Sequence, residues 1–158
     1  MKLLILVDNK NAIAKDGKQI MFVDNDLDMF KNYTTNNIIV MGRKTLDDIG
    51  RQLPNRISVV FTRSEKEDKE DLFYIDSVEK LDKIIEAYPD KEVFVIGGAE
   101  IVKLLWDRID ELIVTRVDTV VEDADTFIPD FDAFKLIDKS EIEDESYRVY
   151  HEKWVREK

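Results

Sequence analysis

The stretch that decides the fold is residues 38–45, Ile-Ile-Val-Met-Gly-Arg-Lys-Thr. Its first four residues form a short, continuous apolar run, which is typical of a strand buried in a parallel sheet. A glycine, two cations and a hydroxyl residue follow. The hydroxyl residue is also the first residue of a segment with a helical pattern, 45–49. This order predicts a strand-to-helix turn whose free amides and positive charges suit a phosphate group. A capped helix with solvent-facing cations fits the same residues equally well.

The same alternation extends along the chain on both sides of this stretch. Strand-length apolar runs and helix-patterned segments take turns, the runs at 3–7, 57–61, 72–75, 93–96 and 112–117, and the helical segments at 25–34, 78–86 and 99–106. Such alternation predicts an α/β domain with a largely parallel sheet. From residue 134 onward, two strand-like stretches flank an acidic turn at 141–146, which predicts a C-terminal antiparallel hairpin. Residues 64–71 are charged at almost every position and predict a solvated loop.

Length and composition restrict the class of protein. The 158 residues fit a single domain, 1–158, that is large enough to bury its own core. The chain has no cysteine and one histidine, His151, so we expect no metal site, disulfide or cysteine nucleophile. A net charge of −11 argues against nucleic acid or an anionic membrane as the partner, and the apolar run at 3–7 is too short to span a bilayer. The absence of cysteine suits the reducing cytoplasm.

One carboxylate lies in an unexpected place on the helix predicted at 25–34. Asp26 shares a helical face with Met29, Phe30 and Tyr33, at spacings of three, four and seven residues. An ionised carboxylate on a buried face is unfavourable unless an internal donor or a cationic or amide-like ligand meets it. We therefore interpret Asp26 as the polar anchor of a small-molecule pocket.

A second turn with glycines lies at Gly97-Gly98, between the apolar run at 93–96 and the helical segment at 99–106. Glycine lets the backbone approach a ligand closely. The pattern is neither GxGxxG nor a Walker loop, and a glycine pair by itself is more often a tight turn. Two strand-to-helix turns that converge on one pyrophosphate would favour a dinucleotide more strongly than either turn separately.

Together these segments resemble the dihydrofolate reductase family. The matching segments occur in the family's order and extend over the chain: Ala12-Ile13 with Lys15-Asp16-Gly17, Asp26-Leu27 with Phe30-Lys31, and then residues 41–45, 53–56, 94–101 and 125–129. The resemblance implies a central eight-stranded, mostly parallel sheet with a C-terminal antiparallel hairpin and four flanking helices. It also implies an oxidoreductase of one-carbon metabolism, a cytoplasmic monomer that uses NADPH to reduce dihydrofolate to tetrahydrofolate and binds antifolates.

The resemblance further implies roles for individual residues. The expected catalytic pair is Asp26, which accepts hydrogen bonds from the pterin 2-amino group and N3, and Thr115, which holds that carboxylate. Arg56 would bind the α-carboxylate of the glutamyl tail. The other substrate-lining residues would be Ile5, Leu6, Phe30, Ile49, Leu53 and Ile96. The cofactor-binding residues would be Leu6, Ile13, Gly42, Arg43, Lys44, Thr45, Thr62, Arg63, Ile96, Gly97, Gly98, Ala99, Glu100 and Ile101, with Thr62 and Arg63 at the 2′-phosphate and a cis peptide between Gly97 and Gly98.

The chain departs from the family pattern around the active-site loop, where residues 19–23 are Gln-Ile-Met-Phe-Val. Met21 occupies the position of a tryptophan that helps to hold a water molecule, and a thioether cannot donate that hydrogen bond. Ile5 and Leu6 occupy positions where small alanines are common, and Val102 replaces a frequent tyrosine. We expect an active but divergent enzyme with an altered proton route and altered sensitivity to antifolates.

Two other functions remain open. An NADPH reductase for another heterocycle, such as the pyrimidine reductase of the riboflavin pathway, would keep both glycine turns without needing Asp26 together with Arg56. A non-catalytic pterin- or nucleotide-binding module would bind NADPH tightly without turnover.

Three further positions receive structural interpretations. We expect Asp24 to cap the helix that contains Asp26. We expect His151 to belong to the terminal hairpin rather than to a catalytic site. Trp106 and Trp154 should be packing anchors, because no basic aromatic stripe accompanies them.

Overall fold

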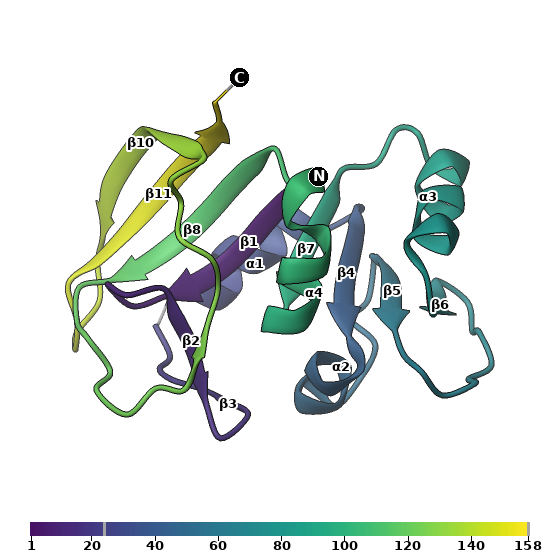
Figure 1. The fold of residues 1–158 in the computed structure, drawn as a ribbon, viewed down its shortest axis with the longest axis horizontal. Coiled ribbons are helices and arrows are strands. Elements are labelled where there is room, and N and C mark those ends of the chain that lie inside the picture. Colours follow the sequence, from purple (N-terminus) through teal and green to yellow (C-terminus); the bar gives the residue numbers. More distant parts are fainter. Residues whose placement is uncertain (24, 158) are drawn as a thin grey trace.

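The computed structural model describes residues 1–23 and 25–157, and its centre is one eight-stranded sheet (Figure 1). The strand order is β10-β11-β8-β1-β7-β4-β5-β6. The strands are β1 (Lys2–Val7), β4 (Ile38–Gly42), β5 (Ile57–Phe61), β6 (Leu72–Ile75), β7 (Val93–Gly97), β8 (Glu111–Val117), β10 (Phe134–Ile142) and β11 (Val149–Arg156). Neighbours from β8 to β6 pair in parallel, whereas β11 is antiparallel to both β8 and β10. The predicted sheet and hairpin are confirmed.

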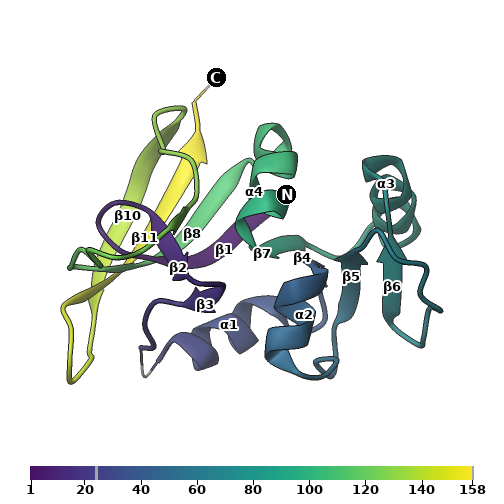
Figure 2. The same cartoon turned by 60° about the horizontal axis from the view of Figure 1, so that its bottom comes forward.

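Within the described residues, four helices cover the two faces of this sheet, as predicted. They are α1 (Asp26–Thr34), α2 (Arg43–Ile49), α3 (Val78–Ala87) and α4 (Ala99–Leu105), and a short 3-10 turn (Trp106–Arg108) follows α4. Figure 2 shows α1 and α2 on one face of the sheet and α3 and α4 on the other. Helix α2 begins two residues earlier than predicted, because the helical backbone starts directly after the extended residue Gly42.

The core follows from this two-sided arrangement. On the α3–α4 face, Leu81, Val102 and Leu105 are fully buried against strand residues such as Val40. On the other face, α1 and α2 contribute partly buried apolar side chains, among them Phe30, around Ile39, Met41 and Phe94. The face beneath α1 and α2 is therefore the less completely filled side of the sheet.

A second, small sheet lies beside the carboxyl end of β1 and was not predicted. Its strands, in the order β3-β2-β9, are β2 (Ala12–Lys15), β3 (Lys18–Gln19) and β9 (Thr126–Phe127). Two to four residues are too few to show a hydrophobic period, so no sequence pattern marked them. The small sheet joins the loop after β1 to the segment around residue 126, which is distant in the sequence.

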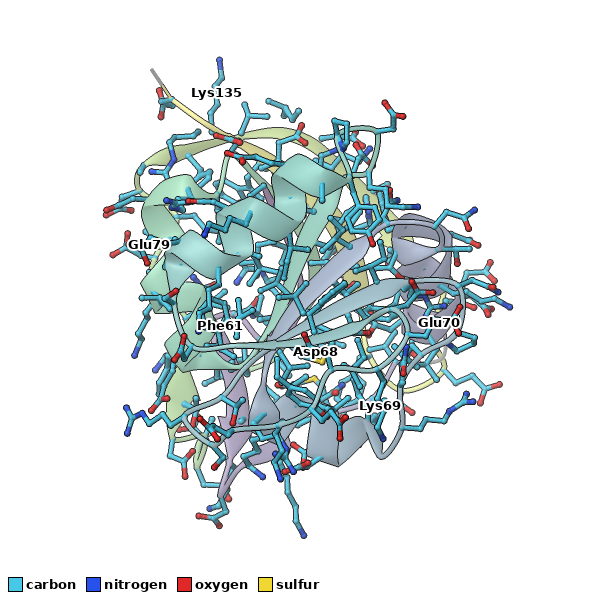
Figure 3. All side chains as sticks on the ribbon, turned by 90° about the vertical axis from the view of Figure 1, so that its right-hand side faces the viewer. Phe61, Asp68, Lys69, Glu70, Glu79 and Lys135 are labelled. Carbon is cyan, nitrogen blue, oxygen red and sulfur yellow. The ribbon has the colours of Figure 1, made fainter. Side chains whose placement is uncertain are left out.

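Two peripheral features agree with the predictions. The charged loop between β5 and β6 is exposed to solvent, and Figure 3 shows Asp68, Lys69 and Glu70 on it. Trp106 and Trp154 each lie against Phe131, with ring centroids 6.3 and 5.1 Å away, so both act as packing anchors. Across the described ranges, no helix is both long enough and apolar enough to cross a membrane.

Candidate active site

A cavity of about 1600 Å³ opens where the parallel strands β1, β4, β5 and β7 end. Ligands of parallel α/β sheets bind at this edge, because the strands there lead into the amino ends of helices. Every site residue predicted from the sequence lines this one cavity. They are Ile5, Leu6, Ile13, Asp26, Phe30, Gly42, Arg43, Lys44, Thr45, Ile49, Leu53, Arg56, Thr62, Arg63, Ile96, Gly97, Gly98, Ala99, Glu100, Ile101 and Thr115.

The carboxylate of Asp26 meets the hydroxyl of Thr115 across the cavity wall. The parallel register of β1 and β8 sets Leu6 beside Thr115, and α1 lies over this part of the sheet. Thr115 Oγ1 donates a hydrogen bond of 3.0 Å to Asp26 Oδ1. Burial raises the pKa of the Asp26 carboxyl, and the hydrogen bond from Thr115 acts in the opposite direction. A carboxylate accepts several hydrogen bonds, so Asp26 keeps capacity for donors on a ligand.

The predicted face of α1 is correct, and three of its four residues, Asp26, Met29 and Phe30, line the cavity. Asp26, Met29, Phe30 and Tyr33 are all partly buried, whereas Leu27 is 79% exposed. Helix α1 begins after Asn25, whose side chain makes no capping hydrogen bond. The predicted cap, Asp24, lies outside the described residues.

Arg56 lies at another end of the cavity with its charge almost buried. The residue is only 8% exposed, and its Nε has no hydrogen-bond partner. Its guanidinium carbon lies 5.8 Å from the centroid of the Phe30 ring. Burial, and to a lesser extent the nearby Arg51, lowers the pKa of Arg56. A buried guanidinium with an unused donor is a suitable site for a carboxylate of a ligand.

The two glycine turns meet at the same edge of the sheet. Strands β4 and β7 are neighbours, with Met41 opposite Gly97. A Cβ atom on Gly42 would lie 3.2 Å from Ile101 Cγ1, so the first turn packs against the helix that follows the second. Helices α2 and α4 begin after Gly42 and Gly98 without a side-chain cap, which leaves their first amides free for an anion. The predicted convergence of the two turns is therefore present.

The second turn requires glycine for its backbone conformation. Gly97 has a φ of +125°, which residues with a side chain rarely adopt, and the Gly97–Gly98 peptide is cis, as expected. The nearest atom to a Cβ built on either glycine is Thr45 Oγ1, at 3.9 and 4.0 Å. The backbone of this turn therefore lies open toward Thr45 and the cavity.

The cations at the first turn have partners of their own. Arg43 Nε lies 3.0 Å from Asp47 Oδ1, and Lys44 Nζ lies 3.4 Å from Asp48 Oδ1, each pair one turn apart on α2. All four side chains are substantially exposed, and ion pairs of this kind contribute little stability. A phosphate group can therefore compete with these carboxylates for both cations.

Sequence reasoning missed part of the cavity wall. The additional lining residues are Leu4, Ala14, Gly17, Lys18, Gln19, Phe22, Leu27, Met29, Lys31, Asp48, Phe61, Asp76, Leu104 and Thr126. Several belong to the segment at 14–22, which contains the end of β2, the two-residue strand β3 and their connections, and which has no periodicity that predicts its course. Met21 does not line the cavity and is only 6% exposed, and its carbonyl accepts a hydrogen bond of 2.7 Å from Gln19 Nε2. Two positions could have indicated lining residues: Met29, on the predicted face of Asp26, and Leu27, directly after Asp26.

The chemistry of the lining residues indicates a site for organic ligands. Within residues 1–23 and 25–157, no group of three or more histidine, aspartate or glutamate side chains could hold a metal ion. The cavity instead combines an apolar wall, one partly buried carboxylate, one buried guanidinium and two backbone turns suited to phosphate. Fold and cavity together define a nucleotide-dependent α/β enzyme.

Comparison with known proteins identifies the family. The family model described as dihydrofolate reductase matches residues 1–156. The dihydrofolate reductase of Haemophilus influenzae is 33% identical over 146 residues, covering 92% of this chain and 86% of that protein. The enzyme of Staphylococcus haemolyticus is 32% identical over 139 residues, covering 87% and 82%. A structure of the Enterococcus faecalis dihydrofolate reductase, complexed with NADP(H) and RAB-propyl, aligns over 99% of this chain and 96% of that one, with a TM-score of 0.84 and 30% identity.

The chain belongs to the dihydrofolate reductase family. It is an NADPH-dependent oxidoreductase that reduces 7,8-dihydrofolate to 5,6,7,8-tetrahydrofolate. The expected family, fold, cofactor and reaction are confirmed, in preference to the riboflavin-pathway alternative and the non-catalytic one.

Proposed function

We propose that Asp26 and Thr115 are the catalytic pair of this reductase. The observation that carries this proposal is the hydrogen bond of 3.0 Å that joins them in the cavity shared with both glycine turns. The Asp26 carboxylate accepts hydrogen bonds from the pterin 2-amino group and N3, which fixes the orientation of the ring. Its negative field favours protonation of N5, and water delivers that proton. NADPH, when bound, supplies the hydride that reduces C6.

The two glycine turns fit the phosphates of NADPH. Free amides at the start of α2 and α4 suit the pyrophosphate, with Arg43, Lys44 and Thr45 at the first turn. Thr62 and Arg63 line the same cavity after β5 and would hold the 2′-phosphate. The remaining proposed cofactor contacts are Leu6, Ile13, Gly42, Ile96, Gly97, Gly98, Ala99, Glu100 and Ile101.

Arg56 binds the α-carboxylate of the glutamyl tail, because its buried guanidinium has an unused donor at Nε. The apolar side chains that line the cavity between Asp26 and this end would contact the pterin and benzoyl groups. They are Ile5, Leu6, Phe30, Ile49, Leu53 and Ile96.

We also propose that the chain acts as one domain, 1–158, as a monomer in the cytoplasm and without a nucleic-acid partner. The net charge of −11 and the absence of cysteine support this proposal. Sedimentation of the purified protein tests the monomer, and a sedimentation coefficient that corresponds to a dimer would contradict it.

Activity with an Asp26→Asn variant tests the proposed site. Purified protein is mixed with NADPH and dihydrofolate, and the loss of nicotinamide absorbance is followed across pH. We expect turnover in the wild type and a loss of about 10²-fold or more near neutral pH in Asp26→Asn. Asp28→Asn is the matched control, because Asp28 is an exposed carboxylate on the same helical turn and does not line the cavity.

The other outcomes discriminate the alternatives. Turnover that is unaffected by Asp26→Asn would keep the activity and overturn the assigned mechanism. NADPH binding without any turnover in the wild type would favour a binding module and would direct attention to the loop at 19–23.

A further inference from the structure

His151, the single histidine of the chain, lies on the strand next to Thr115. The antiparallel register of β8 and β11 sets Thr115 directly opposite His151. Directly opposed residues of neighbouring strands project from the same face of a sheet. The His151 side chain is partly buried on the face that α1 covers, rather than being a plain surface residue of the hairpin.

The imidazole of His151 is bound to α1 through Tyr33. Tyr33 Oη lies 2.9 Å from His151 Nε2, and the two rings are parallel within 3°, with centroids 6.0 Å apart. Tyr33 follows Asp26 by seven residues, which is two helical turns, so both project from the same side of α1. Two hydrogen bonds therefore fasten one helix face to two adjacent strands, Asp26 to Thr115 on β8 and Tyr33 to His151 on β11.

We propose that His151 and Tyr33 are positioning residues that hold α1 where Asp26 meets Thr115, and so set how the carboxylate faces the pterin. The inference rests on the role proposed above for Asp26. Both residues act through the helix and not by contact with substrate, since neither of them lines the cavity.

The surroundings of His151 favour the neutral form of the imidazole. Burial lowers the pKa of His151, and Lys153 on the same strand lowers it further, whereas Asp138 on β10 raises it. Tyr33 faces the imidazole from α1, and Ser140 lies opposite His151 on β10. On β8, the residue opposite His151 is Thr115, which is hydrogen-bonded to Asp26. A neutral imidazole offers one donor and one acceptor, so it can bind the Tyr33 hydroxyl without bringing a positive charge close to the catalytic carboxylate.

A positioning role differs from a purely structural one in its effect on Asp26. The hydrogen bond from Thr115 lowers the pKa of Asp26 against the effect of burial. Loosening α1 changes both the length of this bond and the burial of the carboxyl, so the pKa of Asp26 should shift when either Tyr33 or His151 loses its bond. A purely structural role would lower the melting temperature and leave that pKa unchanged.

The experiment compares Tyr33→Phe, His151→Phe and the double variant with the wild-type protein. We expect kcat/KM for dihydrofolate to fall about two- to tenfold in each single variant, the range of one neutral hydrogen bond. The double variant should lose no more than the stronger single variant. The acid limb of the pH profile should move away from its wild-type position, and KM for NADPH should not change.

Tyr150→Phe is the matched control for the removal of a phenolic hydroxyl. Tyr150 precedes His151 on β11 and therefore points to the opposite face of the sheet, where Lys139 Nζ lies 4.4 Å from its ring centroid. We expect the kinetics and pH profile of Tyr150→Phe to match those of the wild-type protein.

Carbon NMR titration of the Asp26 carboxyl measures the same pKa without relying on turnover. If the wild-type and variant titrations coincide, the positioning role is wrong, even where the variants melt at lower temperature. If Asp26→Asn retains full turnover while the titration shifts in Tyr33→Phe, the catalytic role of Asp26 fails and the coupling through α1 stands. Should His151→Phe not fold, Tyr33→Phe alone still decides the question.

Discussion

Thr115 and Asp26 are 89 positions apart in the chain and share a hydrogen bond of 3.0 Å. The bond gives the carboxylate one donor inside the protein, while burial still raises its pKa. Asp26 is therefore held in place, but the hydrogen bond from Thr115 does not fully offset the cost of burying the carboxylate charge. A ligand with amide-like donors supplies further hydrogen bonds to it.

Asp26→Asn should make the protein more stable at neutral pH while it removes activity. Because burial raises the pKa of Asp26 in the folded protein, the folded state retains a proton that the unfolded chain has released. The free energy of unfolding of the wild type falls as pH rises from the ordinary aspartate pKa to the raised one. Above the raised pKa, the full loss of stability remains. The neutral amide escapes this penalty, so its advantage should grow through the same pH window and then stay constant. Melting temperatures measured against pH test this, and equal values for both proteins at neutral pH would refute it.

Arg56→Gln should weaken the binding of dihydrofolate through its tail. A charge-assisted hydrogen bond to a carboxylate is worth about 1.5 to 3 kcal/mol, so we expect KM for dihydrofolate to rise about ten- to hundredfold. The value of kcat should change little, because the tail is bound equally in the ground and transition states. A substrate analogue without the glutamyl group should bind both proteins alike. Arg51→Gln, an exposed arginine nearby, is the control, and an equal loss in both variants would point to general electrostatics.

Two serine-to-alanine substitutions should change stability in opposite directions. Ser58 is fully buried on β5, and its Oγ has no hydrogen-bond partner, so Ser58→Ala should stabilise the fold by about 1 kcal/mol. Ser77 caps α3 by accepting a hydrogen bond from the Lys80 amide at 3.3 Å, so Ser77→Ala should destabilise the fold by about 1 kcal/mol. Neither residue lines the cavity, and activity should be unchanged. Urea unfolding measures both effects, and a destabilised Ser58→Ala would show that its hydroxyl has a partner in solution.

Ile5→Ala should change the affinity for antifolates. Ile5 lines the cavity next to Leu6, where a bulky side chain narrows the space for a ring. Removing its distal carbons should tighten the binding of the larger antifolates about tenfold, the effect typical of a small change in an apolar pocket. Ile137→Ala provides a control, because Ile137 is 55% exposed on β10, away from the cavity. Identical inhibition of both variants and the wild type would show that Ile5 does not restrict the pocket.

The sequence by itself determined the order and kind of the main elements. Strands β5 and β6 occur at the predicted residues, because each is a short apolar run between polar segments. The same local logic located both glycine turns and indicated that Asp26 was a carboxylate on the cavity side of its helix. These signals are local, since hydrophobic period, glycine position and helical face all depend on residues within a few positions of one another.

Only the tertiary structure decided which distant residues meet. It paired His151 with Tyr33, left Arg56 without a partner at Nε, and assembled the small sheet from strands of two to four residues. The pairing of Asp26 with Thr115 was expected only from the resemblance to the family, and the structure shows it. No local pattern encodes such contacts, because they depend on strand order and register across the whole sheet. The chain therefore indicates in its sequence that a carboxylate needs a partner, and the fold supplies it.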